Sequence, residues 1–177
     1  MTTINQAYIN ALLADAAYVN VTQGMNADAL KSALDDRMTS SQAAYLAANF
    51  GVASSINSSD IPLVGSGFDA TVWRGKTGTE FAGQTFVSMR GTEPDVLSGQ
   101  GADLLADGDL AFKAGARSQI IDMVNWWLSA RTTAGQPAMQ IKWDPLRQPN
   151  PNSIAIEPGF VLSTAVVATG ELAGVAY

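Results

Sequence analysis

The segment that decides the fold reads Thr85-Phe86-Val87-Ser88-Met89-Arg90-Gly91-Thr92-Glu93. Its early positions are apolar, aromatic or β-branched, which is typical of a strand, and Gly91 interrupts the run. Residues 68–74 form an earlier run of the same kind, and residues 75–83 between them are rich in turn formers. Residues 68–74 and 84–90 therefore predict an antiparallel hairpin whose second strand leads into a polar loop at Thr92.

Upstream of the hairpin, the first 50 residues predict a largely helical segment. Apolar residues recur on one helical face, and three sets of capping residues mark helix starts. The inward positions of the first helix are Ile9, Leu12, Leu13, Ala16 and Ala17. The expected caps are Thr3 with Gln6, Asn26, and Thr39 with Gln42. We expect residues 51–67, rich in Ser, Asn and Gly, to form a loop with a short strand near residues 61–64.

Downstream of the hairpin, residues 115–131 return to helical spacing. Ile120, Val124 and Trp127 lie on the apolar stripe of this helix, which we expect to face a sheet. Prolines then recur beyond Gly135, which predicts an extended excursion over the surface. Residues 160–177 are apolar and carry one charged residue, Glu171, so we expect this tail to need a partner surface.

Composition limits the classes of function. The chain has 177 residues, 47% hydrophobic and 15% charged, which predicts a single globular domain, residues 1–177. Its net charge of −6 offers no attraction for a nucleic acid backbone. No apolar run is long enough to span a membrane, and the N-terminus lacks the features of a secretory signal. Composition leaves a cytoplasmic location and signal-less export both open.

The chain contains no cysteine and no histidine. These absences exclude disulfides, thiolate nucleophiles and Cys-ligated zinc within this chain. They also exclude Ser-His and Cys-His catalytic dyads built from its own residues, because histidine is the usual general base at neutral pH. We expect no cofactor in this chain.

Other local patterns favour structural roles. Gly75-Lys76-Thr77 lacks the first glycine and the following helix of a phosphate-binding P-loop. Asp103, Asp107 and Asp109 do not have EF-hand spacing, which favours solvated or helix-capping carboxylates. Trp127, beside Trp126, lies on the apolar stripe and is expected to be part of the core.

The segment ending in Arg90-Gly91-Thr92, together with Ala102-Asp103-Leu104-Leu105-Ala106-Asp107, resembles the corresponding stretch of fungal-type (class 3) lipases and their bacterial relatives. The helical N-terminus, residues 67–74, residues 119–128 and residues 168–175 resemble neighbouring parts of the large bacterial members. The resemblance implies an α/β fold, the N-terminal portion of an α/β-hydrolase with a helical N-terminus, an antiparallel hairpin and a helix packed on the sheet.

In that family the hydroxyl residue after the glycine supplies part of the oxyanion hole, and the resemblance assigns this role to Thr92. The alternative is that Thr92 is a strand-end hydroxyl that caps the next turn. The family's Gly-x-Ser-x-Gly elbow is missing, as is its histidine, so the chain is expected to be an incomplete domain that is inactive alone.

The resemblance further implies carboxylic ester substrates such as acylglycerols, extracellular location, and calcium binding in the full-length family. The expected partner is the remaining C-terminal part of the catalytic domain or a second chain. A different class of function stays open, a non-enzymatic binding or interaction module on a degenerate hydrolase scaffold.

Overall fold

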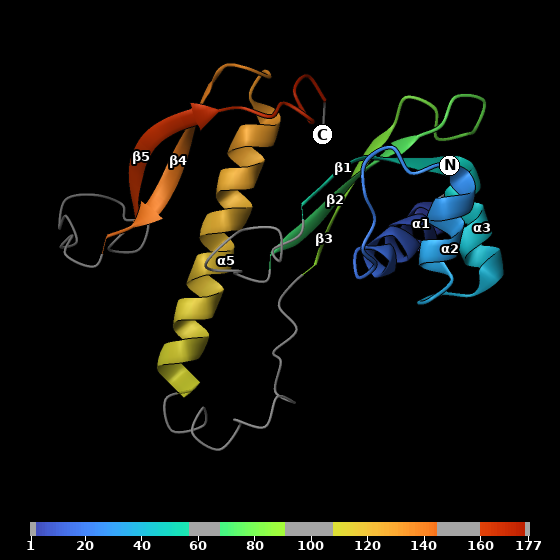
Figure 1. Ribbon diagram of the computed structural model, residues 1–177, viewed down its shortest axis with the longest axis horizontal. Helices are drawn as coiled ribbons and strands as arrows, with labels where there is room; N and C mark the ends of the chain where they lie inside the picture. Colours follow the sequence, from blue (N-terminus) through green and yellow to red (C-terminus); the bar gives the residue numbers. More distant parts are fainter. Residues whose placement is uncertain (1–2, 57–67, 91–107, 145–159, 176–177) are drawn as a thin grey trace. The chain divides into compact units, whose positions relative to one another are not determined.

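The structure is a computed structural model that describes residues 3–56, 68–90, 108–144 and 160–175. The chain forms two compact units, Met1–Glu93 and Pro94–Tyr177, which we call the N-terminal unit and the C-terminal unit. Each unit combines helix with an antiparallel sheet, so the described chain is mixed α/β (Figure 1). The short strand expected near residues 61–64 lies outside the described residues.

In the N-terminal unit, helices come first and strands follow. The described elements are α1 (Thr3–Ala16), α2 (Ala27–Leu34), α3 (Ser40–Asn49), β1 (Phe50–Ile56), β2 (Asp69–Gly75) and β3 (Thr85–Arg90). The described strands form an antiparallel sheet in the order β1-β2-β3. The predicted hairpin is confirmed, because β2 pairs with β3 from Asp69 opposite Arg90 to Arg74 opposite Thr85.

Two of the three expected caps are confirmed. Asn26 Oδ1 accepts a hydrogen bond of 2.9 Å from Ala29 N–H, and Thr39 forms a reciprocal capping box with Gln42. Each cap satisfies backbone N–H groups that have no partner within the helix. The third differs, because α1 already includes Thr3 and the Gln6 amide donates to Asn10 one turn later.

The expected loop after α3 is wrong over its first residues, because residues 50–56 form β1. Gly51, Ser54 and Ser55 have little intrinsic preference for a strand. The strand forms because its backbone pairs with β2 and because Phe50 and Val52 enter the core. Tertiary packing here overrides local preference.

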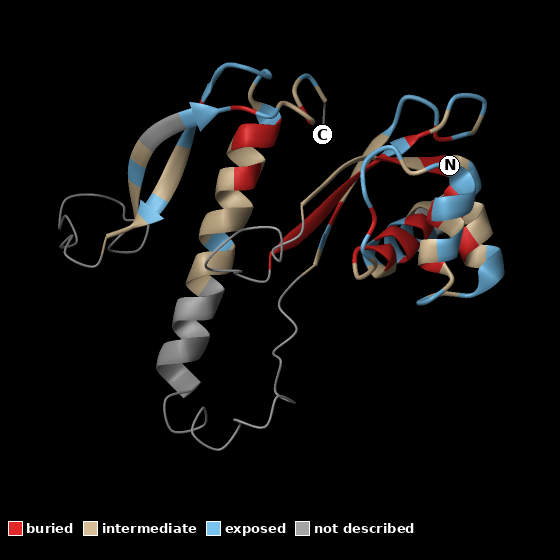
Figure 2. Cartoon of the chain, viewed as in Figure 1, coloured by how far each residue is buried: buried red, intermediate tan, exposed pale blue. Residues whose placement is uncertain are grey.

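The core of the N-terminal unit lies where the helices meet the sheet (Figure 2). All five residues predicted on the inward face of the first helix are buried, including Ala17, which directly follows α1. Phe81, from the connection between β2 and β3, is fully buried and stacks on Phe50 with ring centroids 4.7 Å apart. Trp73, at the middle of the hairpin, is also fully buried, and its indole Nε1–H donates to Ser88 Oγ at 2.8 Å.

Replacing Ser88 by alanine is expected to destabilise the N-terminal unit by about 1–3 kcal/mol, because the buried Trp73 indole N–H loses its acceptor. Guanidinium unfolding followed by circular dichroism measures the change. The matched control is Ser55→Ala on β1 of the same sheet, which is expected to change stability by less than about 0.5 kcal/mol. Equal effects of the two substitutions would contradict this role of Ser88.

The described part of the C-terminal unit contains one long helix and a strand pair. Its described elements are α5 (Gly108–Arg131), β4 (Pro137–Trp143) and β5 (Phe160–Val167), with β4 and β5 antiparallel. The predicted helix is confirmed and starts earlier than residue 115. The proline-rich stretch begins as β4, and residues 145–159 lie outside the described residues. The apolar tail forms β5, then a turn that places Leu172 in a fully buried position.

The apolar stripe of α5 is only partly covered. Val124 and Trp127 are half-buried, so Trp127 is only partly in the core, and Ile120 is 47% exposed. Trp126 is the more buried member of the tryptophan pair. Among the described strands, α5 packs on β4 of a two-stranded sheet, which is too narrow to cover the whole stripe.

Candidate functional site

Thr92, the predicted oxyanion-hole residue, lies outside the described residues. The structure does describe β3, the strand that leads to it, as far as Arg90. The structure therefore bears on Thr92 through the contacts that hold the end of β3.

The end of β3 is held by Arg90. Its guanidinium Nη1 lies 3.2 Å from Asp69 Oδ2, and Asp69 is also its cross-strand partner at the start of β2. The Arg90 Cζ lies 5.3 Å from the centroid of the Tyr18 ring, which follows α1. An ion pair and a cation–π contact thus tie the last residue of β3 to two other segments.

A second guanidinium meets the same ring. Arg37, between α2 and α3, places its Cζ 4.3 Å from the Tyr18 centroid and donates from Nε to Asp15 Oδ1 at 2.8 Å. We call these five residues the Tyr18 cluster: Asp15, Tyr18, Arg37, Asp69 and Arg90. The two cations are each matched by a carboxylate, so they can lie near one aromatic ring without a net local charge.

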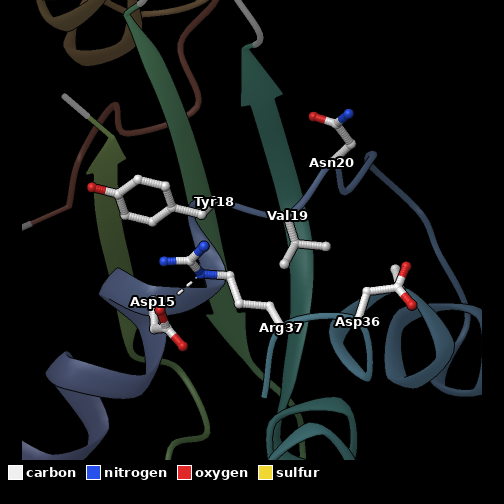
Figure 3. Close-up of a pocket in the computed structure, with 7 residues that line it drawn as sticks. Asp15, Tyr18, Val19, Asn20, Asp36 and Arg37 are labelled. Atoms are coloured by element: carbon white, nitrogen blue, oxygen red, sulfur yellow. Dashed lines mark hydrogen bonds and ion pairs between the residues drawn. The ribbon is translucent and has the colours of Figure 1, made fainter. Parts of the chain in front are cut away.

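A surface pocket of about 560 Å³ adjoins the Tyr18 cluster (Figure 3). It is lined by Asp15, Tyr18, Val19, Asn20, Ala33, Asp36 and Arg37. Figure 3 shows the Arg37 guanidinium between the Tyr18 ring and Asp15, with Asp36 on the far side of Val19. Among the described residues, the lining combines two carboxylates, one guanidinium and one phenol, and it includes neither a serine nor a threonine.

Sequence reasoning missed most of the Tyr18 cluster. Arg90 and Asp69 lie on the two predicted strands of the hairpin, and the hairpin register places them opposite each other. Tyr18 and Arg37 come from separate helical connections, and no spacing rule links them to each other or to β3.

The other motifs noted in the sequence, at residues 75–77 and at the three aspartates, have structural roles or lie outside the described residues. Lys76 Nζ donates to the Ala47 carbonyl near the end of α3, where a cation also complements the helix dipole. Gly75 packs against the Phe81 backbone. The segment 75–77 therefore serves packing and helix capping. Asp103 and Asp107 lie outside the described residues, as does the side chain of Asp109.

The C-terminal unit carries an apolar groove of about 320 Å³ between α5 and the strand pair. It is lined by Ile120, Val124, Ile141, Phe160, Val161 and Leu162. Beside it, the Trp143 ring contacts Phe160 with centroids 5.3 Å apart, and the Arg117 Cζ lies 3.8 Å from the Trp143 centroid. The described residues that line the groove are all apolar.

Within the described ranges, no group of three or more His, Cys, Asp or Glu residues is placed to hold a metal ion. No described helix is both long and apolar enough to cross a membrane. Comparisons with protein-family models, with curated proteins and with solved structures find no match to this chain.

Proposed function

We propose that this chain is the N-terminal portion of an α/β-hydrolase of the lipase or esterase type. In this role it supplies scaffold and one oxyanion-hole residue, Thr92, for hydrolysis of carboxylic esters such as acylglycerols. The observation that carries the proposal is the β2–β3 hairpin, whose second strand ends at Arg90 immediately before Gly91-Thr92 and is held there by Asp69 and Tyr18.

An oxyanion donor at Thr92 requires that the strand before it end in a fixed position. Such a donor accelerates a reaction only if its position is fixed before charge develops on the substrate oxygen, and one donor contributes about 3–4 kcal/mol. The ion pair at Asp69 is three-quarters or more buried on both side chains, so it is less screened by solvent than a surface pair. The Tyr18 cluster therefore acts in this proposal as a positioning device for the backbone that precedes Thr92.

The nucleophile and its base come in this proposal from outside the chain. Ester hydrolysis by the family mechanism needs a serine elbow and a histidine, and this sequence contains neither. The partner is therefore the remaining part of the catalytic domain or a second chain. Extracellular location follows from the same resemblance.

A non-enzymatic binding module is the second candidate function. The observation that favours it is the apolar groove of the C-terminal unit, which has exposed aliphatic side chains and no catalytic group. Under this alternative, Thr92 caps a turn, and its hydroxyl affects stability alone.

The test measures hydrolysis of p-nitrophenyl butyrate by the full-length protein encoded by the gene, which we call the complete gene product, carrying Thr92→Val. We expect kcat to fall about 10²-fold with little change in KM, because the lost donor acts on the transition state. Thr133→Val, at an exposed threonine of the C-terminal unit, is the matched control and is expected to leave kcat unchanged.

Two results would overturn the proposal. One is a complete gene product that hydrolyses no ester. The other is a Thr92→Val variant that loses thermal stability and keeps the kcat of the Thr133→Val control, which is the result that the turn-capping role predicts.

A further inference from the structure

The apolar groove of the C-terminal unit is built from one helix and two strands. Helix α5 lies beside β4, and β5 lies on the other side of β4 (Figure 1). The Asn125 side chain holds α5 against β4: its Oδ1 accepts from Ile141 N–H at 2.7 Å, and its Nδ2 donates to Ile141 C=O at 3.0 Å. The amide pairs with Ile141 as a neighbouring strand would, so it closes this edge of the strand pair at Ile141 and fixes the groove wall on α5.

The groove is open to solvent although apolar side chains line it. Ile120 on α5 is 47% exposed, and Leu162 on β5 is 69% exposed. Both residues line the groove, whose volume of about 320 Å³ is at the lower end of the range for small-molecule sites. The volume and the lining fit a single slender hydrocarbon chain, which would remove these side chains from water.

A cation lies at one end of the groove. Arg117 precedes Ile120 by one helical turn and Val124 by two, so the three residues lie on one face of α5. Its guanidinium Cζ is 3.8 Å from the centroid of the Trp143 ring, which contacts Phe160 of the groove lining with centroids 5.3 Å apart. The cation–π contact holds the guanidinium in place. Within the described part of the chain, no carboxylate forms an ion pair with it.

The contacts of α5 give the groove a direction. Asn125 meets the backbone of Ile141. About two turns earlier on the helix, Arg117 meets the ring of Trp143, which lies two residues further along β4. The apolar lining therefore runs along α5 and ends at the guanidinium. An apolar slot that ends at one cation is complementary to a long hydrocarbon chain with one anionic head group.

We propose that this groove binds a free long-chain fatty acid, with the hydrocarbon chain against Ile120 and Phe160 and the carboxylate on the Arg117 guanidinium. A guanidinium presents paired N–H donors that match the two oxygens of a carboxylate. This inference holds whether or not the protein takes part in ester hydrolysis, because it concerns the binding of the free acid by the isolated chain.

Charge favours a fatty acid over a purely apolar occupant. An aliphatic segment of another chain would cover the groove and leave the Arg117 guanidinium without a charged partner beside desolvated surface, which is unfavourable. A fatty acid fills the apolar lining and supplies the missing carboxylate in one ligand.

Isothermal titration calorimetry of the 177-residue chain with octanoate, decanoate and dodecanoate, each below its micelle concentration, tests the proposal. We expect a dissociation constant on the order of 10–100 µM for dodecanoate. Each added methylene should tighten binding about 2- to 4-fold, because it removes further hydrocarbon from water. Decan-1-ol, which keeps the chain length and lacks the charge, should bind about 10-fold more weakly than decanoate.

Arg117→Gln should remove this preference, so that decanoate and decan-1-ol bind equally. The matched control is Lys142→Gln, because Lys142 alternates with Ile141 and Trp143 along β4 and therefore lies on the other face of the strand pair. The control should keep the preference of the wild type. Ile120→Glu should weaken the binding of both ligands by at least about 10-fold, because it places a charge in the apolar lining. This variant keeps the proposal testable if Arg117→Gln fails to fold.

The absence of saturable dodecanoate binding would overturn the proposal. Equal binding of decanoate and decan-1-ol by the wild-type chain would also overturn it, as would equal losses in Lys142→Gln and Arg117→Gln. A wild-type dimer that Ile120→Glu converts to a monomer in light scattering would overturn it in favour of a second copy as the occupant of the groove.

Discussion

Replacing Gly75 by alanine is expected to unfold the N-terminal unit. A Cβ atom at this position would lie 1.8 Å from the Phe81 carbonyl oxygen and 2.4 Å from its carbonyl carbon. These are backbone atoms of a fully buried residue that stacks on Phe50, so they cannot move away as a flexible side chain would. We expect a loss of at least about 4 kcal/mol, a large part of the stability of an ordinary domain.

Chemical denaturation followed by circular dichroism measures this loss. The matched control is Gly51→Ala on β1, opposite Arg74 in the same sheet. A Cβ at Gly51 would meet only Lys76 Cε, at 3.9 Å, which is an ordinary contact. We expect this control to be neutral or slightly stabilising, because alanine lowers the entropy of the unfolded chain. A Gly75→Ala protein that unfolds at the wild-type midpoint would refute the close packing of Phe81 on Gly75.

The isolated 177-residue chain is expected to hydrolyse no p-nitrophenyl ester above a heat-denatured sample. Removing the nucleophile or base of a serine hydrolase costs about 10⁶-fold in kcat, and this chain has neither a histidine nor a Gly-x-Ser-x-Gly elbow. An oxyanion donor cannot replace them, because it stabilises an intermediate that a nucleophile must first form.

The measurement is the release of p-nitrophenol at micromolar protein over several hours, with the complete gene product assayed in parallel. Turnover by the isolated chain that disappears when one of its own serines is changed to alanine would contradict the prediction. Such a result would mean that the chain holds a nucleophile that works without histidine.

Features that depend on near neighbours in the chain could be predicted from the sequence. The Asn26 cap and the Thr39–Gln42 capping box join residues within one helical turn, so their spacing alone is sufficient. The β2–β3 hairpin joins two runs across a short connection, and its strands were expected within a residue or two of their observed ends. The helical period of residues 115–131 predicted α5 but could not show that its packing partner would be narrow.

The candidate site could be predicted only in part. The sequence pointed to Thr92 through the residues around it, and to β3 as the strand that leads there. Tyr18 and Arg37 were missed, since they contact Arg90 or its surroundings only after three helices have packed on a sheet.

The sequence by itself determined which chemistry is excluded, where α2 and α3 begin and which two runs form the hairpin. These properties depend on residue types and on spacings of a few residues. The local free energy differences are large enough to decide between helix, strand and turn. The tertiary structure alone decided that residues 50–56 form β1, that two guanidiniums meet at the Tyr18 ring and that Asn125 closes one edge of the β4–β5 sheet. Each depends on groups far apart in the chain, whose contacts become favourable only when burial has removed both partners from water.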